Sequence, residues 1–488
     1  MNEKSSWETV IGLEIHVELN TKSKLFSTAP NRFGDEPNTN INEVCTGQPG
    51  ALPVLNREAV RKAVQFGCAI NGNVAKFSKF DRKSYFYPDS PRNFQITQFD
   101  QPIVVGGEVV AEVNGHEMTF GLTQVHLEDD AGMLKHFSTF AGADYNRAGV
   151  PLIEIVSNPC IHSAEEAVAY CTAVKAILQY IDASDCNMEE GSLRVDANIS
   201  VRKKGETILR NKIEIKNMNS FSAMKLAIEA EVKRQIMEYT RNPDKPHGEV
   251  ILQATYRWDP EKMETTIMRR KESAVDYLYF PEPDLLPIVL TDSFIEEIRN
   301  SLPELPLQRE RRYVQQLGMS EHNAFVLTSD KSLADYYEEA LKDCTNGKNL
   351  GNWLIVEFSA RLKDSGKNII NCGIPPSHVA DLINKVEDGT ITGRIAKDIA
   401  DEMVATPGRH PAEIIASNPN YMPVHDHSEI EPFVIQVLEK NPQSITDYRA
   451  GREKALSFLI GQVMKLTSGK ASPAVVNELI QKHLKEQS

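Results

Sequence analysis

Residues 10–19, VIGLEIHVEL, alternate between apolar positions and positions that are mostly polar or small. A period of two is typical of a half-buried β-strand, because successive side chains of a strand point to opposite faces of its sheet. The apolar positions are Ile11, Leu13, Ile15, Val17 and Leu19. On the other face Glu14, His16 and Glu18 follow one another. The sequence therefore predicts an early strand that lines up two carboxylates and an imidazole.

The same alternation returns at 153–157, 193–202 and 212–217, and each of these segments predicts another strand. Two segments between them, 163–181 and 220–239, have apolar residues at three- and four-residue spacing. Each opens with a serine, which is a preferred residue at a helix N-terminus. Up to about residue 295 the sequence therefore predicts strands with interspersed helices.

The pattern changes around SLPELP at 301–306 and becomes almost entirely helical. Breaker residues at 406–411, TPGRHP, mark a second boundary, and further helices are predicted near Ser444 and from Pro473. We therefore predict an α+β protein, with a mixed catalytic domain at 1–296 followed by two all-helical domains, 297–409 and 410–488.

The composition, 41% hydrophobic and 25% charged residues among 488, is typical of a globular protein. No run of 18 apolar residues and no leader-like start is present, so we expect no membrane contact and a cytoplasmic location. The seven cysteines form no CxxC pair, which argues against disulfides and zinc. The net charge is −14, yet the residues from 449 onward carry seven bases and three acids. The tail is therefore locally basic.

Several carboxylates of the first domain lie inside predicted strands. Glu154 is flanked by apolar residues on both sides, and three acids follow one another at 128–130. Any single one of these acids can simply face solvent, but a buried carboxylate favours a cation as its partner. Carboxylates with one histidine favour Mg²⁺ or Mn²⁺ over zinc. Glu128 and Asp129 would point to opposite sides of a regular strand, so each is a candidate ligand of a different ion.

Residues 80–99 interleave basic and aromatic side chains, among them Arg82, Lys83 and Tyr87. Such a segment either binds a nucleotide by stacking and charge or is simply packed. The basic tail allows the same two interpretations, a phosphate-binding surface or a solvated one. Neither a P-loop nor a GxSxG motif occurs, so we expect no P-loop nucleotide site and no serine-nucleophile hydrolase.

Seven segments, taken in order, resemble the motifs of the B subunits of aspartyl/glutamyl-tRNA amidotransferases. They are ETVIGLEIHVEL, FDRKSYFYPD, VHLEDDAG, NRAGVPLIEIVS, MEEGSLRVDANIS, KIEIKNMNSF and DYLYFPEPDLLP. The resemblance continues into the tail with KALSFLIGQVMK and SPAVVNELI.

The resemblance implies a cradle-shaped catalytic domain and an ATP-dependent enzyme that works as a heterotrimer, together with an amidase A subunit and a small C subunit. The B subunit would phosphorylate the side-chain carboxylate of Glu-tRNA(Gln) or Asp-tRNA(Asn). Ammonia released from glutamine by the A subunit would then displace the phosphate. The expected cofactors are ATP and one or two Mg²⁺ ions, and the helical tail would bind tRNA.

The resemblance also implies particular site residues. One Mg²⁺, at the catalytic centre, would be held by Glu14, His16, Asp129 and Glu154. A second divalent ion would be near Glu128, Glu190, Asp196 and Glu214. We expect nucleotide or substrate to be bound by Arg82, Lys83, Tyr87, Arg147, Arg194 and Lys216. The expected tRNA-binding residues are Arg449, Arg452, Lys454, Lys465 and Lys470.

The sequence departs from the family pattern at three places. Many relatives carry cysteine pairs for zinc around residues 27–45, where only Cys45 remains, so no zinc is expected. Leu278 and Met133 replace basic residues. Two other function classes stay open, a tRNA-binding scaffold without catalysis and a metal-dependent nuclease or phosphatase. The buried acids argue against the scaffold, and the motif order and the basic tail argue against the nuclease.

Overall fold

A computed structural model describes residues 6–270, 277–422, 426–449, 452–467 and 469–486. The chain divides into two compact units, residues 1–307 and 308–488. The first is built on a large sheet and the second is helical, which confirms the predicted α+β class.

Among the described residues of the first unit, ten strands form the main sheet, in the order β15-β14-β13-β12-β1-β11-β8-β6-β2, with β7 paired to β8 outside this path. Apart from the parallel pair β13–β14, neighbouring strands are antiparallel. The strands are β1 (Trp7–Glu18), β2 (Asn73–Val74), β6 (Val104–Val105), β7 (Glu108–Val113), β8 (His116–Asp129), β11 (Pro151–Ser157), β12 (Leu193–Lys203), β13 (Ile213–Lys216), β14 (Ala254–Asp259) and β15 (Glu264–Arg270). The predicted strands are therefore confirmed.

Two smaller strand pairs and one three-stranded sheet are also present among the described residues. They are β3 (Phe77–Ser78) with β17 (Ile288–Val289), β9 (Met133–His136) with β10 (Ala141–Asp144), and β4 (Asp81–Ser84) between β5 (Phe94–Thr97) and β16 (Tyr279–Pro281). The basic and aromatic segment at 80–99 therefore contributes two strands to a small sheet of its own.

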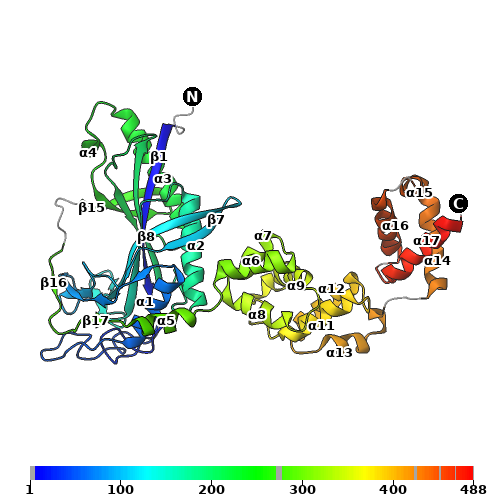
Figure 1. Ribbon diagram of the computed structural model, residues 1–488, viewed down its shortest axis with the longest axis horizontal. Helices are drawn as coiled ribbons and strands as arrows, with labels where there is room; N and C mark the ends of the chain where they lie inside the picture. The colour runs from blue at the N-terminus through cyan, green and yellow to red at the C-terminus, as the bar shows by residue number, and fades with distance from the viewer. Residues whose placement is uncertain (1–5, 271–276, 423–425, 450–451, 468, 487–488) are drawn as a thin grey trace. The chain divides into compact units, whose positions relative to one another are not determined.

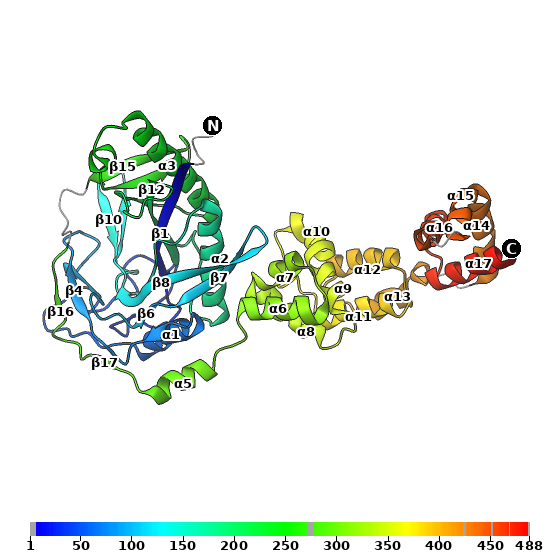
Figure 2. The same ribbon diagram turned by 45° about the horizontal axis from the view of Figure 1, so that its top comes forward.

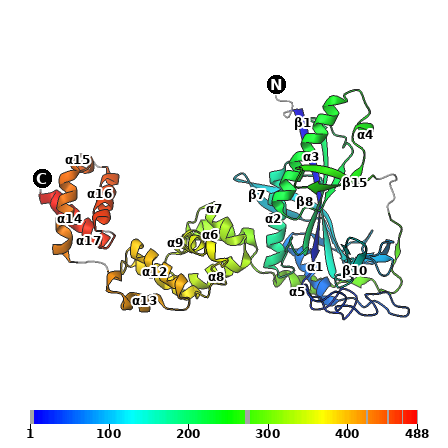
Figure 3. The ribbon, with the colours of Figure 1, turned by 180° about the vertical axis from the view of Figure 1, so that it is seen from behind.

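Two long helices, α2 (Ala164–Tyr180) and α3 (Phe221–Arg241), pack against each other and on the sheet (Figure 1 and, from behind, Figure 3). Their caps are as predicted, because Ser163 Oγ accepts from the Glu166 N–H and Ser220 Oγ from the Ala223 N–H. The apolar residues of β1 lie in the core with these helices, and Ile11, Leu13 and Ile15 are 0% exposed. The polar face of the same strand is half-buried on the other side.

The first core continues past residue 296. Helix α5 (Asp292–Asn300) lies next to α1 (Arg57–Ala69), as Figure 2 shows, and its Ile295 and Ile298 belong to the first core. A short helix α4 (His247–Val250) completes the first unit.

The second unit contains two hydrophobic cores, one within residues 313–421 and one within 430–484. Its helices are α6 (Pro306–Leu317), α7 (Glu321–Thr328), α8 (Lys331–Leu341), α9 (Gly347–Asn352), α10 (Ser359–Leu362), α11 (Pro376–Glu387), α12 (Gly393–Ala405), α13 (Pro411–Ser417), α14 (His427–Lys440), α15 (Pro442–Arg449), α16 (Glu453–Leu466) and α17 (Pro473–Glu486), with a π-helical turn at Trp353–Phe358. Ile414 and Ile415 of α13 pack into the earlier core, so the segment after 409 contributes to both. Among the described helices none is long and apolar enough to cross a membrane.

Candidate metal centre and cavity

The polar face of the sheet collects charged side chains because opposed residues of antiparallel strands point to the same side. His16 of β1 lies opposite Glu154 of β11, and Glu154 lies opposite His126 of β8. On the other flank of β1, Glu14 lies opposite Asp196 of β12. Four neighbouring strands thus bring residues that are far apart in sequence into adjacent rows.

The first candidate ligand group is His16, Glu128 and Glu154, whose ligand atoms all lie within 4.8 Å of one another. His16 Nε2 is 3.4 Å from Glu154 Oε2. Burial acts to raise the pKa of Glu154, but the charges and hydrogen bonds of His126 and His16 outweigh it and hold the pKa well below its ordinary value. Glu154 is therefore an anion ready to bind a cation.

The second candidate group is Glu14, Asp196 and Glu214, also within 4.8 Å. The Lys216 ammonium pairs with Asp196 and lies 3.1 Å from Glu214 Oε1. Burial, followed by the charges of neighbouring carboxylates, raises the pKa of Glu14. Three acids converge here, and a lysine supplies part of the positive charge that they require.

Two neighbours fix the orientation of the second group. Asn198 Nδ2 donates to Glu14 Oε1 at 2.8 Å, and Thr255 Oγ1 donates to Glu214 Oε2 at 2.9 Å. Donors of this kind hold a carboxylate in one rotamer and leave its other oxygen to face a cation.

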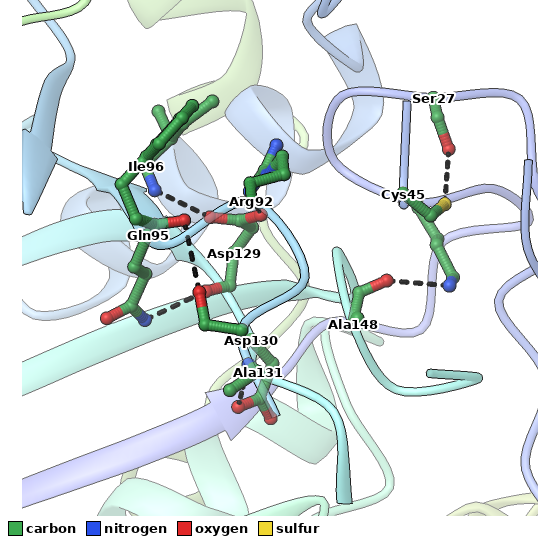
Figure 4. Close-up of polar contacts among 12 residues, drawn as sticks. Ser27, Cys45, Arg92, Gln95, Ile96, Asp129, Asp130, Ala131 and Ala148 are labelled. Atoms are coloured by element: carbon green, nitrogen blue, oxygen red, sulfur yellow. Dashed lines mark hydrogen bonds and ion pairs between the residues drawn. The ribbon is translucent and has the colours of Figure 1, made fainter. Parts of the chain in front are cut away.

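The grouping differs from the sequence expectation at Glu14, Glu128 and Asp129. Glu14 was expected beside His16 and lies in the second group, whereas Glu128 was expected in the second group and lies in the first. Asp129 belongs to neither group. Glu128 and Asp129 are neighbours on β8 and point to opposite faces, so Glu128 joins His16 and Glu154 while Asp129 does not. The Asp129 carboxylate instead pairs with Arg92 and accepts from the Ile96 N–H at 2.8 Å (Figure 4). Glu190 lies exposed on the turn after Asn187, outside both groups.

Two cavities adjoin these groups. One, of about 740 Å³, is lined by all six candidate ligands, Glu14, His16, Glu128, Glu154, Asp196 and Glu214. The other, of about 660 Å³, is lined by Arg92, Arg147 and Arg194 among others. His16, Glu128 and Asp196 line both, as do Lys83 and Lys216. Anionic and cationic walls therefore face a shared space.

The residues expected to bind nucleotide or substrate have different surroundings. Lys83 lines both cavities, with its ammonium 4.9 Å from the ring centroid of Tyr277. Tyr87 is 52% exposed and lines the larger cavity. Arg82 lines neither cavity; it forms a two-pronged ion pair with the buried Glu282 (Nε–Oε2 2.7 Å).

The two arginines of this set that line a cavity, Arg147 and Arg194, are half-buried and surround the buried Asp130. Arg194 pairs with Asp130, and Arg147 Nε lies 3.6 Å from the same carboxylate. Arg147 also donates to the carbonyl oxygens of Ala131 and Gly132, at 2.9 and 2.8 Å. Both guanidinium groups are thus anchored at the wall of the smaller cavity.

His126 is absent from the expected site residues, although the structure places it between the first-group carboxylates. Its Nε2 lies 3.2 Å from Glu154 Oε2 and 3.7 Å from Glu128 Oε2. Burial acts to lower the pKa of His126, but the charges of Glu154 and Glu128 raise it to about 10. The sequence contains part of this signal, because His126 and Glu128 are two residues apart and share a strand face. The approach of Glu154 depends on the register of β8 with β11.

The three departures from the family pattern occupy separate places. Met133 lines the smaller cavity, and Leu278 is 68% exposed. Cys45 Sγ lies 3.3 Å from Ser27 Oγ, close to the buried Lys24, whose ammonium donates to the Ala148 carbonyl at 2.6 Å (Figure 4).

The basic residues of the tail lie on or beside α15 and α16. Arg449 donates to the Leu484 carbonyl at 3.3 Å, and Arg452 pairs with Asp447 at 3.2 Å. Lys454, Lys465 and Lys470 are exposed. The charge of this segment is therefore carried at the surface.

A mostly antiparallel sheet with two carboxylate-rich groups beside cationic cavity walls, followed by a helical unit, is an arrangement suited to an enzyme that acts on charged substrates. Residues 9–296 match the family model described as the GatB/GatE catalytic domain, and residues 335–484 match the GatB domain. The chain belongs to this family, which confirms the resemblance found in its motifs.

Relatives match over nearly the whole chain. The B subunit of aspartyl/glutamyl-tRNA(Asn/Gln) amidotransferase from Protochlamydia amoebophila is 73% identical over 480 residues, which cover 98% of this chain and 97% of the relative. The proteins of the same name from Chlamydia abortus and Chlamydia pneumoniae are 60% and 59% identical over 476 residues, covering 98% of both chains.

Proposed function

We propose that this chain is the subunit of a tRNA-dependent amidotransferase that activates and amidates the side-chain carboxylate of Glu-tRNA(Gln), Asp-tRNA(Asn) or both. The names of relatives aligned over 98% of the chain support the overall reaction. The observation that carries the assignment of the activation step to this chain is the pair of three-ligand groups inside one cavity.

The donor atoms fit divalent cations. The first group supplies one imidazole and two carboxylates, and the second supplies three carboxylates, a set that suits Mg²⁺ or Mn²⁺. Glu128 Oε2 is buried and has no hydrogen-bond partner among the described residues, as expected of an atom that serves a cation. Glu14 and His16 are two residues apart on β1, which separates their Cα atoms by about 7 Å and makes the groups neighbours.

The proposed reaction has two steps. A side-chain carboxylate oxygen attacks the γ-phosphorus of ATP, and the bond from this phosphorus to the ADP oxygen breaks. Ammonia then forms a C–N bond with the resulting acyl phosphate, the C–O bond breaks with release of phosphate, and the nitrogen loses a proton. Bound divalent ions would offset the repulsion between the two anions of the first step.

The chain's own cations supply the remaining positive charge. Lys83 and Lys216 line both cavities, and Arg194 lines the smaller one. We assign to them the binding of the nucleotide phosphates and the substrate carboxylate, because charge-assisted hydrogen bonds to such oxygens are strong and directional. Arg147 and Tyr87 border the same space and are assigned to substrate binding as well.

The proposed partners are the subunits that would supply ammonia and complete the complex. Ammonia would come from glutamine through the amidase A subunit, and the small C subunit would complete the heterotrimer. The exposed lysines of the tail support an assignment of tRNA binding to that segment, since lysine and arginine side chains bind phosphates by charge.

Reconstitution tests the proposal. The chain is combined with its A and C partners, ATP, glutamine and Glu-tRNA(Gln) or Asp-tRNA(Asn), and both ADP and amidated aminoacyl-tRNA are measured. Glu154→Gln should lower both products by about 100-fold or more while tRNA affinity stays unchanged. Glu165→Gln is the matched control, because Glu165 is exposed on α2 and pairs with Lys225 (2.9 Å) away from both ligand groups. A wild-type complex that forms neither product would refute the proposal and favour a non-catalytic scaffold.

A further inference from the structure

His126 is a buried histidine whose only polar contacts among the described residues are carboxylates of the first ligand group. Its Nε2 lies 3.2 Å from Glu154 Oε2 and 3.7 Å from Glu128 Oε2. The residue is 7% exposed, and its Nδ1 is buried with no hydrogen-bond partner in the described ranges. All of its polar interaction is therefore made through one nitrogen.

Glu154 Oε2 is shared by two imidazoles. His16 Nε2 approaches it at 3.4 Å and His126 Nε2 at 3.2 Å, from strands on opposite sides of β11. When His16 binds a cation, its Nε2 lone pair faces the ion and this nitrogen no longer donates to Glu154. His126 can still donate to Glu154 when a cation is bound, because His126 is outside the three-ligand group. The two histidines are therefore suited to different roles.

We propose that His126 is a positioning residue whose Nε2–H is directed at Glu154 Oε2 (3.2 Å) and holds this carboxylate at the separation from Glu128 that a divalent cation requires. The carboxylates of the buried Glu128 and the half-buried Glu154 repel each other at this separation, and a donor beside them reduces that repulsion. Donors behind the ligands of a metal typically change its affinity 10- to 100-fold. This inference rests on the proposed function, and it assigns His126 a role that is separate from ligation.

The test measures Mn²⁺ binding to the reconstituted complex by electron paramagnetic resonance of the free ion. Glutamine places its amide nitrogen where histidine has Nε2, whereas asparagine places it near Nδ1. We expect His126→Ala and His126→Asn to weaken Mn²⁺ binding 10- to 100-fold, and His126→Gln to retain an affinity close to that of the wild type. Glu154→Gln identifies which binding event belongs to the first group.

His162→Gln is the matched control. His162 is 43% exposed, and its Nδ1 contacts the Thr9 carbonyl at 2.8 Å, away from the ligand groups. This variant should leave Mn²⁺ affinity unchanged. If His126→Ala does not fold, the comparison of Gln with Asn decides, because a merely structural role gives no reason for Gln to restore metal affinity and Asn not to.

Failure of the His126 role and failure of the metal site give different results. Wild-type-like Mn²⁺ affinity in His126→Ala, or equal behaviour of Gln and Asn, refutes the positioning role and leaves the metal site standing. If Glu154→Gln binds Mn²⁺ as tightly as the wild-type complex at every site, both the metal site and the His126 role are overturned.

Discussion

We expect Lys216 to compete with a divalent cation for the second ligand group, so that its removal strengthens metal binding there. Its ammonium pairs with Asp196 and lies 3.1 Å from Glu214 Oε1. A charge-assisted hydrogen bond contributes about 1.5–3 kcal/mol. The side chain is 36% exposed, which favours the lower limit because solvent screens the charge. About 1.4 kcal/mol is a factor of ten in affinity. Lys216→Met, which keeps the length and removes the charge, should therefore bind Mn²⁺ about tenfold more tightly at this group.

The same substitution should lower stability when no divalent ion is present. Glu14, Asp196 and Glu214 then face one another without the lysine, and their mutual repulsion opposes folding. We expect Lys216→Met to unfold at a lower temperature in chelator and to gain more from added Mn²⁺ than the wild type gains. Lys225→Met, on the exposed face of α3, is the control and should change neither quantity. Unchanged or weaker Mn²⁺ affinity in Lys216→Met would show that the lysine does not compete for the site.

Burial, then the charge of Asp130, raises the pKa of Glu18 from 4.5 to about 8. The folded state therefore keeps the Glu18 proton to a higher pH than the unfolded state does, so the free energy of unfolding of the wild type should fall as the pH rises from about 4 to 8. In Glu18→Gln the unfolding temperature should depend less on pH over this range. The double substitution Lys454→Glu, Lys465→Glu should weaken tRNA binding and make the tRNA affinity less dependent on salt concentration, and it should leave the Mn²⁺ affinity unchanged. Titrations of the complex with tRNA at several salt concentrations measure this. Ser163→Ala should lower the free energy of unfolding by about 1 kcal/mol in urea.

Local patterns predicted most of the elements because they depend on nearest neighbours. The alternation around Glu14 predicts β1, and the serines at 163 and 220 predict the starts of α2 and α3, as the structure confirms. The exact first and last residues of the helices are less accessible to such patterns. Helix α15 begins at Pro442, two residues before Ser444, because proline fits a first helical turn.

The members of the candidate site were largely found in the sequence, but their grouping was not. Glu128 and Asp129 are adjacent acids that the sequence alone does not distinguish. Only the strand register shows which of them shares a face with His16 and Glu154. The sequence alone gives His126 little weight, because a single histidine next to three acids is not distinctive until its cross-strand partner Glu154 is known. Such information is non-local, and periodicity within one strand does not contain it.

The apolar face of β1 restricts the geometry of the polar face without fully fixing it. A slip of one residue would turn Glu14 and His16 toward the core and is excluded by the buried face. A slip of two keeps the burial pattern but places His16, rather than Glu14, opposite Asp196 and separates both ligand groups.

Contacts at the far end of β1 discriminate against that second slip. Glu8 forms an ion pair with the opposed Arg202 (Oε2–Nε 2.9 Å), and the Lys203 ammonium lies 3.9 Å from the ring centroid of the opposed Trp7. Glu8 is six residues from Glu14, about 20 Å along the strand. A two-residue slip breaks both contacts at once, so residues remote from the cavity select the register in which the two ligand groups form.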